Sequence, residues 1–206
     1  MKILPQDLDP LASYRLMTGV VVPRPIAWVT TLSAEGVANL APFSCYSFLS
    51  SYPPMIGITI GKRRGRLKDT ARNIQHSREF VVHTADQSLL PQLHGSADEY
   101  PSEQSELDAL GLHTISSDMV AVPRIANAPI AMECRLAQTL HFGAAGSEFV
   151  VGEVLAFHIR DGLYVNGKID STMLMPIGRL AGPNYIGIGE VFPMQPNVAQ
   201  GNQEVI

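Results

Sequence analysis

The stretch VVVPRPIAWVTTLSAEGVANLAPFSCYSFLSSYPP, residues 20–54, decides the fold. Its segment from Pro25 to Leu32 is rich in Ile, Val, Trp and Thr, which favours a half-buried β-strand. The tripeptide Ala34-Glu35-Gly36 predicts a turn, because Gly36 can adopt a positive φ at little cost. We therefore expect a hairpin whose returning arm runs from Val37 to Ser51.

The returning arm combines small hydroxyl side chains with apolar residues and contains a proline. Pro42 lacks the amide hydrogen that a strand in the middle of a sheet donates to its neighbour. A strand that only filled a core would not need this composition, so we expect a ligand to bind along the arm.

A basic turn follows the next expected strand, Met55 to Ile60. The turn reads GKRRGR, residues 61–66, and a helix is expected to begin near Lys68, with Asp69 or Thr70 as its cap. The free amides of the first helical turn, the helix dipole and the basic side chains together suit a phosphate group. The turn alone also fits a solvated basic loop before an ordinary helix.

The remaining pattern predicts more strands than helices. Strands are expected at Arg78 to Thr84, Gly111 to Ser117, Ile130 to Phe142 and Phe149 to Ile159, the last buried on both faces. A short helix is expected within residues 86–94 if Pro91 falls in its first turn, and the polar residues 95–108 are expected to form a surface excursion. The pattern therefore predicts a mainly β protein, an antiparallel barrel with peripheral helices.

Bulk properties exclude several classes of protein. With 206 residues and 46% hydrophobic residues, the chain is expected to form one domain over residues 1–192, with a flexible or partner-wrapping tail at 193–206. The net charge of −4 and the short basic run argue against nucleic-acid binding. We see no signal peptide and no membrane-spanning run, and only two cysteines, so a cytoplasmic location is expected.

Several segments together resemble a known family. PRPIAWVTTLSAEGVANLAPFS, the SYPP step and KDTARNI followed by EFVVHT resemble the flavin reductase-like, FMN-binding split-barrel family. The resemblance is dense from about Val21 to Ala85 and resumes at residues 149–170 and 176–191. It implies an antiparallel, Greek-key-like split β-barrel that forms a homodimer and binds FMN, or FAD in its place.

The resemblance also implies which residues contact the flavin. The ring is expected near residues 39–45 and Thr30, and the phosphate and ribityl chain near residues 50–73. The implied cofactor-binding residues are Thr30, Asn39, Ala41, Pro42, Phe43, Ser44, Cys45, Ser50, Ser51, Arg63, Lys68, Asp69, Thr70 and Asn73. Asp69 is interpreted as a cap rather than a ligand, because a carboxylate would repel a phosphate. No catalytic side chain is expected, since the flavin carries the redox chemistry.

Other notable residues have simpler structural interpretations. Trp28 is expected in the core, Cys45 is expected to be a small buried residue rather than a redox thiol, and most of the six histidines are expected to be structural or on the surface. His141 with Phe142 can cover the ring from a facing strand or be a core histidine. Arg179 and Tyr185 can reach a flavin or nicotinamide across a dimer interface, or Arg179 can form a surface salt bridge. No dinucleotide-binding glycine motif, phosphate-binding loop, hydrolase motif or metal-ligand spacing is found.

Three hypotheses about function remain at this point. The first is an NAD(P)H-dependent flavin reductase in which the nicotinamide passes hydride to flavin N5, with oxygen, a partner oxygenase or another acceptor taking the electrons. The second is a flavoredoxin-like electron carrier that a partner protein reduces and that lacks its own nicotinamide activity. The third is a barrel that has lost its flavin and serves as an interaction module.

Overall fold

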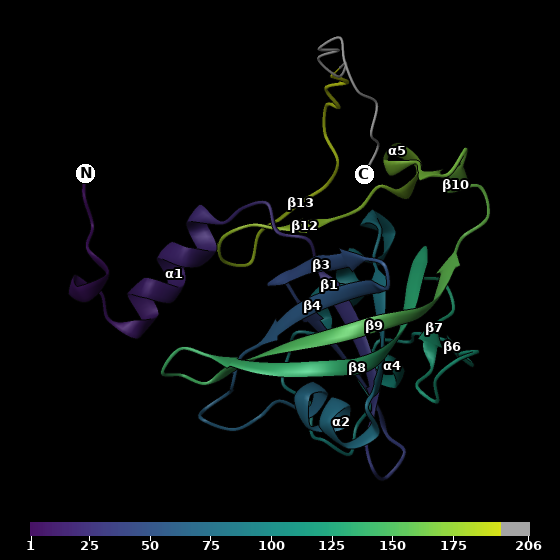
Figure 1. The fold of residues 1–206 in the computed structure, drawn as a ribbon, viewed down its shortest axis with the longest axis horizontal. Helices are drawn as coiled ribbons and strands as arrows, with labels where there is room; N and C mark the ends of the chain where they lie inside the picture. The colour runs from purple at the N-terminus through teal and green to yellow at the C-terminus, as the bar shows by residue number, and fades with distance from the viewer. Residues whose placement is uncertain (195–206) are drawn as a thin grey trace.

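A computed structural model describes residues 1–194 of the chain, and a seven-stranded antiparallel sheet forms its centre (Figure 1). The strand order is β2-β1-β5-β8-β9-β4-β3. These strands are β1 (Ala27–Leu32), β2 (Ala38–Phe43), β3 (Tyr46–Ser51), β4 (Pro54–Ile60), β5 (Glu79–Thr84), β8 (Ile130–Phe142) and β9 (Ser147–Ile159). Except for its first two residues, the expected tail at 193–206 lies outside the described part of the chain.

The stretch that decides the fold supplies both edges of this sheet. The turn at Gly36 is confirmed, with a φ of 83°, and β2 pairs with β1. The prediction of a single returning arm from Val37 to Ser51 is wrong. The chain bends at Ser44 and Cys45, and β3 then pairs with β4 at the opposite edge of the sheet. The chain passes from β2 at one edge to β3 at the other through the two-residue link at Ser44 and Cys45, so the sheet curls until its edges lie close together. The Thr59 amide donates to the Cys45 carbonyl at 2.8 Å and extends the pairing of β3 with β4. The result is a split barrel.

Two apolar layers lie on the two faces of this sheet. Inside the barrel, Val29, Ile58 and Phe80 pack with Ala71 and Ile74 of helix α2 (Asp69–Ser77). On the outer face of the first hairpin, residues such as Trp28 and Leu40 pack against the excursion that follows β5. That excursion contains η2 (Gln87–Leu89), α3 (Leu90–Gly95), α4 (Glu106–Ala109), β6 (Thr114–Ile115) and β7 (Arg124–Ile125). The first strand is thus buried on both faces.

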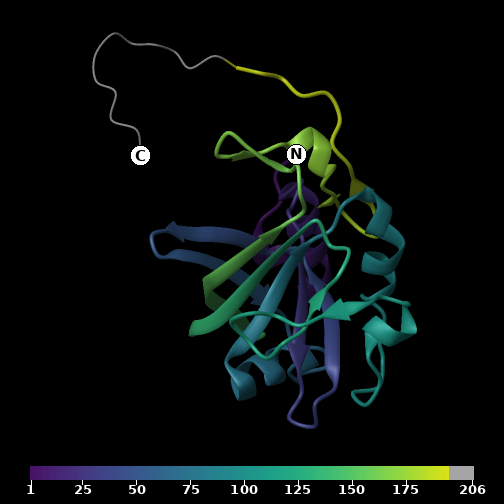
Figure 2. The same ribbon diagram turned by 90° about the vertical axis from the view of Figure 1, so that its right-hand side faces the viewer.

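Short elements at both ends of the chain meet beside the sheet (Figures 1 and 2). The N-terminal ones are η1 (Pro5–Asp7) and α1 (Pro10–Val20), and α1 buries none of its residues. The C-terminal ones are β10 (Tyr164–Val165), β11 (Lys168–Ile169), α5 (Ser171–Leu174), β12 (Gly178–Arg179) and β13 (Tyr185–Ile186). A backbone bridge between Arg24 and Arg179 joins the β12–β13 hairpin to the residues just before β1.

The expected strands at 78–84, 130–142 and 149–159 are confirmed to within two residues, as is a helix with Pro91 in its first turn. The strand expected at 111–117 is shorter than predicted and spans only Thr114–Ile115. Two burial predictions are wrong. The first strand, expected to be half-buried, is buried on both faces, and the second half of β9 is not, since Phe157 is 54% exposed. The excursion 95–108 is mostly exposed, as expected, although it buries Glu106. Within the described residues, no helix has the length and apolar character needed to span a membrane.

Candidate functional site

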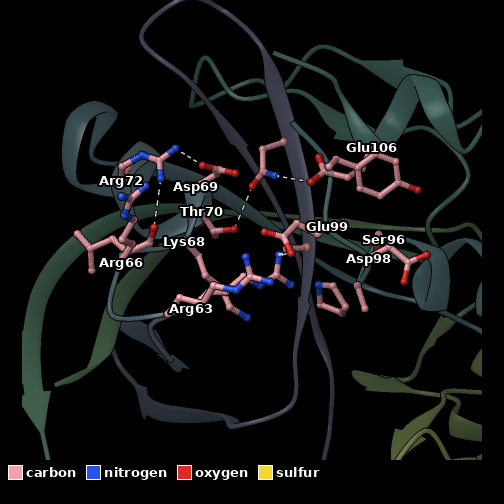
Figure 3. Close-up of a pocket in the computed structure, with 17 residues that line it drawn as sticks. Arg63, Arg66, Lys68, Asp69, Thr70, Arg72, Ser96, Asp98, Glu99 and Glu106 are labelled. Carbon is pink, nitrogen blue, oxygen red and sulfur yellow. Dashed lines mark hydrogen bonds and ion pairs between the residues drawn. The ribbon is translucent and has the colours of Figure 1, made fainter. Parts of the chain in front are cut away.

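A pocket of about 540 Å³ opens between the edge strand β2, the basic turn, the start of α2 and the segment 96–106 (Figure 3). It therefore joins the two regions in which the sequence predicts ligand contacts. Its lining residues are Asn39, Ala41, Pro42, Arg63, Arg64, Arg66, Leu67, Lys68, Asp69, Thr70, Arg72, Ser96, Ala97, Asp98, Glu99, Tyr100 and Glu106.

The basic turn brings three arginines to one end of the pocket. Arg63 and Arg66 exchange both backbone hydrogen bonds at 2.9 Å. Arg64 and Gly65 between them have φ values of 50° and 77°. This is the geometry of a type I′ hairpin turn, for which a glycine at the second central position is favoured. The turn is thereby held so that all three arginines line the pocket.

The charges around the pocket are unevenly paired. Arg63 lies 3.8 Å from Glu99 across the pocket (Figure 3), and Arg72 pairs with Asp69 on α2. Among the described residues, no acidic group forms an ion pair with Arg64, Arg66 or Lys68. The end of the pocket formed by the turn and Lys68 therefore carries positive charge that an anion can neutralise.

Lys68 is the most constrained of these cations. It is the N-cap residue of α2, so the expected capping by Asp69 or Thr70 is wrong. The Lys68 ammonium lies 5.3 Å from the centroid of the Phe43 ring. Burial, and secondarily the charge of Arg63, lower the pKa of Lys68. A bound anion at this position would favour the charged form of the lysine.

Asn39 organises the polar wall opposite the basic turn. Its side-chain amide donates to Glu106 at 2.7 Å, and its carbonyl oxygen accepts from Thr70 at 3.0 Å and from Thr31 at 3.4 Å. The second carboxylate oxygen of Glu106 accepts from the Leu40 amide at 2.8 Å. Burial is the largest influence on Glu106 and raises the pKa of its carboxyl group. These bonds fix the orientation of the Asn39 amide at the pocket surface.

The implied flavin-contact residues divide into three groups. Asn39, Ala41, Pro42, Arg63, Lys68, Asp69 and Thr70 line this pocket. Asn73 lines an adjoining pocket of about 520 Å³ and donates to Thr31, while Ser44 lines a third pocket on the other side of Pro42. Thr30, Phe43, Cys45, Ser50 and Ser51 line none of these three pockets.

The residues outside the pockets have identifiable positions. Thr30 is buried and donates to the Pro123 carbonyl at 2.8 Å, and Phe43 belongs to the barrel interior. Ser50 and Ser51 lie on β3 at the opposite edge of the sheet order. Cys45 is exposed, so its expected burial is wrong, because it sits in the link between β2 and β3.

Sequence reasoning missed Glu106 and Thr31. Glu106 is 67 residues from Asn39, and no local pattern connects them. Thr31 was detectable, because the hairpin around Gly36 places it directly opposite Asn39. The side chains of neighbouring strand residues point to opposite faces, so Thr31 rather than Thr30 reaches the network.

The other residues with alternative interpretations are also placed. Trp28 is confirmed as a core residue, with its indole donating to Ser96 at 2.8 Å. His141 is 64% exposed at its side chain and lies 3.4 Å from Glu148, so it is not a core histidine. Arg179 and Tyr185 line the third pocket and contact each other.

A separate polar cluster joins β8 and β9 to the link between β6 and β7. Asp118, Glu133 and His158 bring their side chains within 4.8 Å of one another. The fully buried Glu133 carboxylate accepts from the Asp118 and Met119 amides at 2.8 and 2.6 Å. These bonds hold the segment around Met119 against the sheet, which is a structural role.

The curled antiparallel sheet, with a basic pocket beside its edge strand, defines this protein as a split barrel. The chain belongs to the flavin reductase like domain family, whose profile matches residues 17–173.

Several solved structures are similar to the chain, and three of them follow. Component B of nitrilotriacetate monooxygenase from Bacillus cereus is 36% identical with a TM-score of 0.91, over 94% of this chain and 98% of that one. The 2-nitrobenzoate 2-nitroreductase NbaA from Pseudomonas fluorescens is 32% identical with a TM-score of 0.88, over 98% and 100%. A protein with a split barrel domain from Shewanella frigidimarina has 20% identity and a TM-score of 0.84 over 95% and 98%, and shares the fold.

Proposed function

We propose that this protein is an FMN-binding oxidoreductase that acts as an NAD(P)H-dependent flavin reductase. The observation that carries the proposal is the pocket in which β2 faces unpaired basic side chains. Its volume of about 540 Å³ lies within the range of small-molecule sites. Arg64, Arg66, Lys68 and the first amides of α2 offer the donors that a phosphate requires. FAD is longer than FMN on the far side of that phosphate, so it would need additional room there.

In this proposal the flavin lies along β2 with its phosphate at the basic turn. The ring then lies near Ala41 and Pro42, with Asn39 held by Glu106 and Thr70 to present a fixed amide. A bound flavin would supply the redox chemistry, which in this proposal is hydride transfer from the nicotinamide to N5. The chain's own residues bind the phosphate, orient the ring and leave one face of it open.

In this proposal a second component or a small acceptor would take the electrons. A partner oxygenase is supported by the similarity to component B of a monooxygenase.

We also propose a homodimer. Large apolar side chains are exposed on the edge strand β3 and after it, where Phe48 is 76% and Tyr52 is 95% exposed, and α1 buries no residue. Light scattering after size exclusion should give twice the chain mass of 22.3 kDa.

The decisive test is the absorbance spectrum of the purified protein with FMN, followed anaerobically. A bound-flavin band that bleaches on addition of NADH or NADPH supports the reductase and identifies its donor. A band that bleaches only with dithionite contradicts the reductase and supports the flavoredoxin-like carrier. Protein that takes up no FMN contradicts the site itself.

A further inference from the structure

The third pocket, of about 400 Å³, is lined by residues of α1, of the segment just before β1 and of the β12–β13 hairpin, and we call it the α1–hairpin groove. Figure 1 shows α1 and this hairpin beside the sheet. It adjoins the first pocket, because Pro42 and Ala97 line both. The proposed flavin phosphate site does not use its charged residues.

Positive charge in the groove has no acidic counterpart. Arg15, Arg24 and Arg179 line it, and its lining contains no Asp or Glu. Within residues 1–194 none of the three arginines forms an ion pair. Arg24 is only 7% exposed, and its guanidinium donates to the Ser44 hydroxyl and to the carbonyls of Thr18, Val21 and Leu180. Carbonyl groups satisfy its hydrogen bonds but leave its charge unneutralised.

Two of these arginines also face each other across a backbone bridge. The Arg24 amide donates to the Arg179 carbonyl at 3.0 Å, and the Arg179 amide donates to the Arg24 carbonyl at 2.8 Å. Like charges directly opposite each other on paired backbones destabilise the pairing. An anion bound in the groove would offset this repulsion.

Aromatic side chains give the groove its shape. The Arg179 guanidinium lies 4.5 Å from the centroid of the Tyr185 ring. The Tyr185 hydroxyl lies 3.0 Å from His94 Nδ1, and the two rings meet edge to face. Tyr14 of α1 lines the same groove. A flat ring can therefore lie beside the tyrosines while an attached anionic group meets the guanidinium edge.

We propose that the α1–hairpin groove binds a small aromatic carboxylate of one or two rings. Arg179 and Arg15 bind the carboxylate, Arg24 supplies a buried positive charge, and Tyr14 and Tyr185 contact the ring. The bound acid lies beyond Pro42 and Ser44, at the end of the flavin pocket. Only this adjacency to the flavin rests on the proposed function.

Salicylate, whose own fluorescence reports its binding, tests the proposal with the flavin-free full-length protein. Salicylate should bind with a 1:1 stoichiometry, and the neutral analogue benzamide should bind at least about tenfold more weakly. Arg179→Gln should weaken salicylate binding about tenfold, and Arg15→Gln should weaken it less, because Arg15 is on the exposed helix α1. Arg66→Gln, at the phosphate end of the other pocket, should weaken FMN binding and leave salicylate binding unchanged.

Three outcomes overturn the proposal. The first is equal affinity for salicylate and benzamide. The second is unchanged salicylate binding in both Arg179→Gln and Arg15→Gln. The third is displacement of salicylate by FMN, which would assign the groove to the flavin ring. Salicylate binding that persists in the FMN-loaded protein supports it. If FMN does not bind but salicylate binds in an Arg179-dependent way, the proposed function fails and the groove assignment stands.

Discussion

Acidification from pH 7 to pH 5 should destabilise the protein through His83, a fully buried residue of β5. Its Nδ1 lies 3.0 Å from the Trp28 carbonyl oxygen, and its Nε2 accepts from the Ile125 amide at 3.0 Å. Only a neutral ring with its hydrogen on Nδ1 satisfies both contacts. Burial is the main reason that the pKa of His83 falls from 6.5 to about 4.

The sign and size of the effect follow from this lowered pKa. Below pH 6.5 the unfolded chain binds a proton at His83 that the folded chain does not bind until about pH 4. The stabilisation is therefore complete above pH 6.5 and is lost progressively as the pH falls from 6.5 toward 4. At pH 5 the loss covers 1.5 pH units, or about 2 kcal/mol at 1.36 kcal/mol per unit.

Urea unfolding at pH 7 and pH 5 measures this loss. The matched variant is His83→Gln, which keeps a donor and an acceptor but does not titrate. Other groups titrate in both proteins, so the difference between their pH-dependent changes isolates His83. The wild type should lose about 2 kcal/mol more than the variant on acidification. Equal losses in the two proteins would refute the reasoning.

Three further predictions concern the pocket and the barrel. Lys68→Met should weaken FMN binding about 10- to 100-fold in a fluorescence titration. Binding of riboflavin, which has no phosphate, should stay nearly unchanged, and equal losses of affinity for both ligands would contradict a phosphate contact. Gly152→Ala places a Cβ against the Phe80 ring and should cost about 1–3 kcal/mol in urea unfolding, whereas Gly61→Ala meets no atom within 4 Å and should cost less. Glu106→Gln replaces one carboxylate oxygen by an NH₂ group, which cannot accept from either of the two donors, Asn39 and the Leu40 amide. The variant should lose about 1–3 kcal/mol of unfolding free energy and exchange the Leu40 amide hydrogen faster. Unchanged exchange at Leu40 would contradict a role for the carboxylate.

The sequence predicted the elements better than their connections. The composition of residues 25–32 and the positive φ available to Gly36 are local properties, and the strand and the turn that they predict are confirmed. The half-burial expected of the strand is wrong, because the excursion after β5 covers its outer face. The separation of β2 from β3 depends on a bend at Ser44 and Cys45, where neither residue is a glycine or proline. The bend is imposed by closure of the barrel, which a local pattern does not encode.

The candidate site was predictable where its residues are close in the chain. Asn39 to Pro42 and Arg63 to Thr70 meet in one pocket because β2 and α2 are neighbours in the folded barrel. The segment 96–106 closes the same pocket from a distant part of the chain, and its polar composition predicted only a surface excursion. Glu106 is buried there because it meets two donors on β2, a fact that only the tertiary structure reveals.

Pro42 explains why this pocket lies at the edge strand. The Leu40 amide points away from β1, since it donates to Glu106. Amides two residues apart point to the same side of a strand, so the nitrogen of Pro42 also faces outward. The proline therefore leaves the pairing with β1 intact and removes a donor only from the free edge. An edge with a full row of donors invites another strand to pair with it. With Leu40 engaged by Glu106 and no hydrogen at Pro42, the edge is closed to strand pairing and available to a ligand.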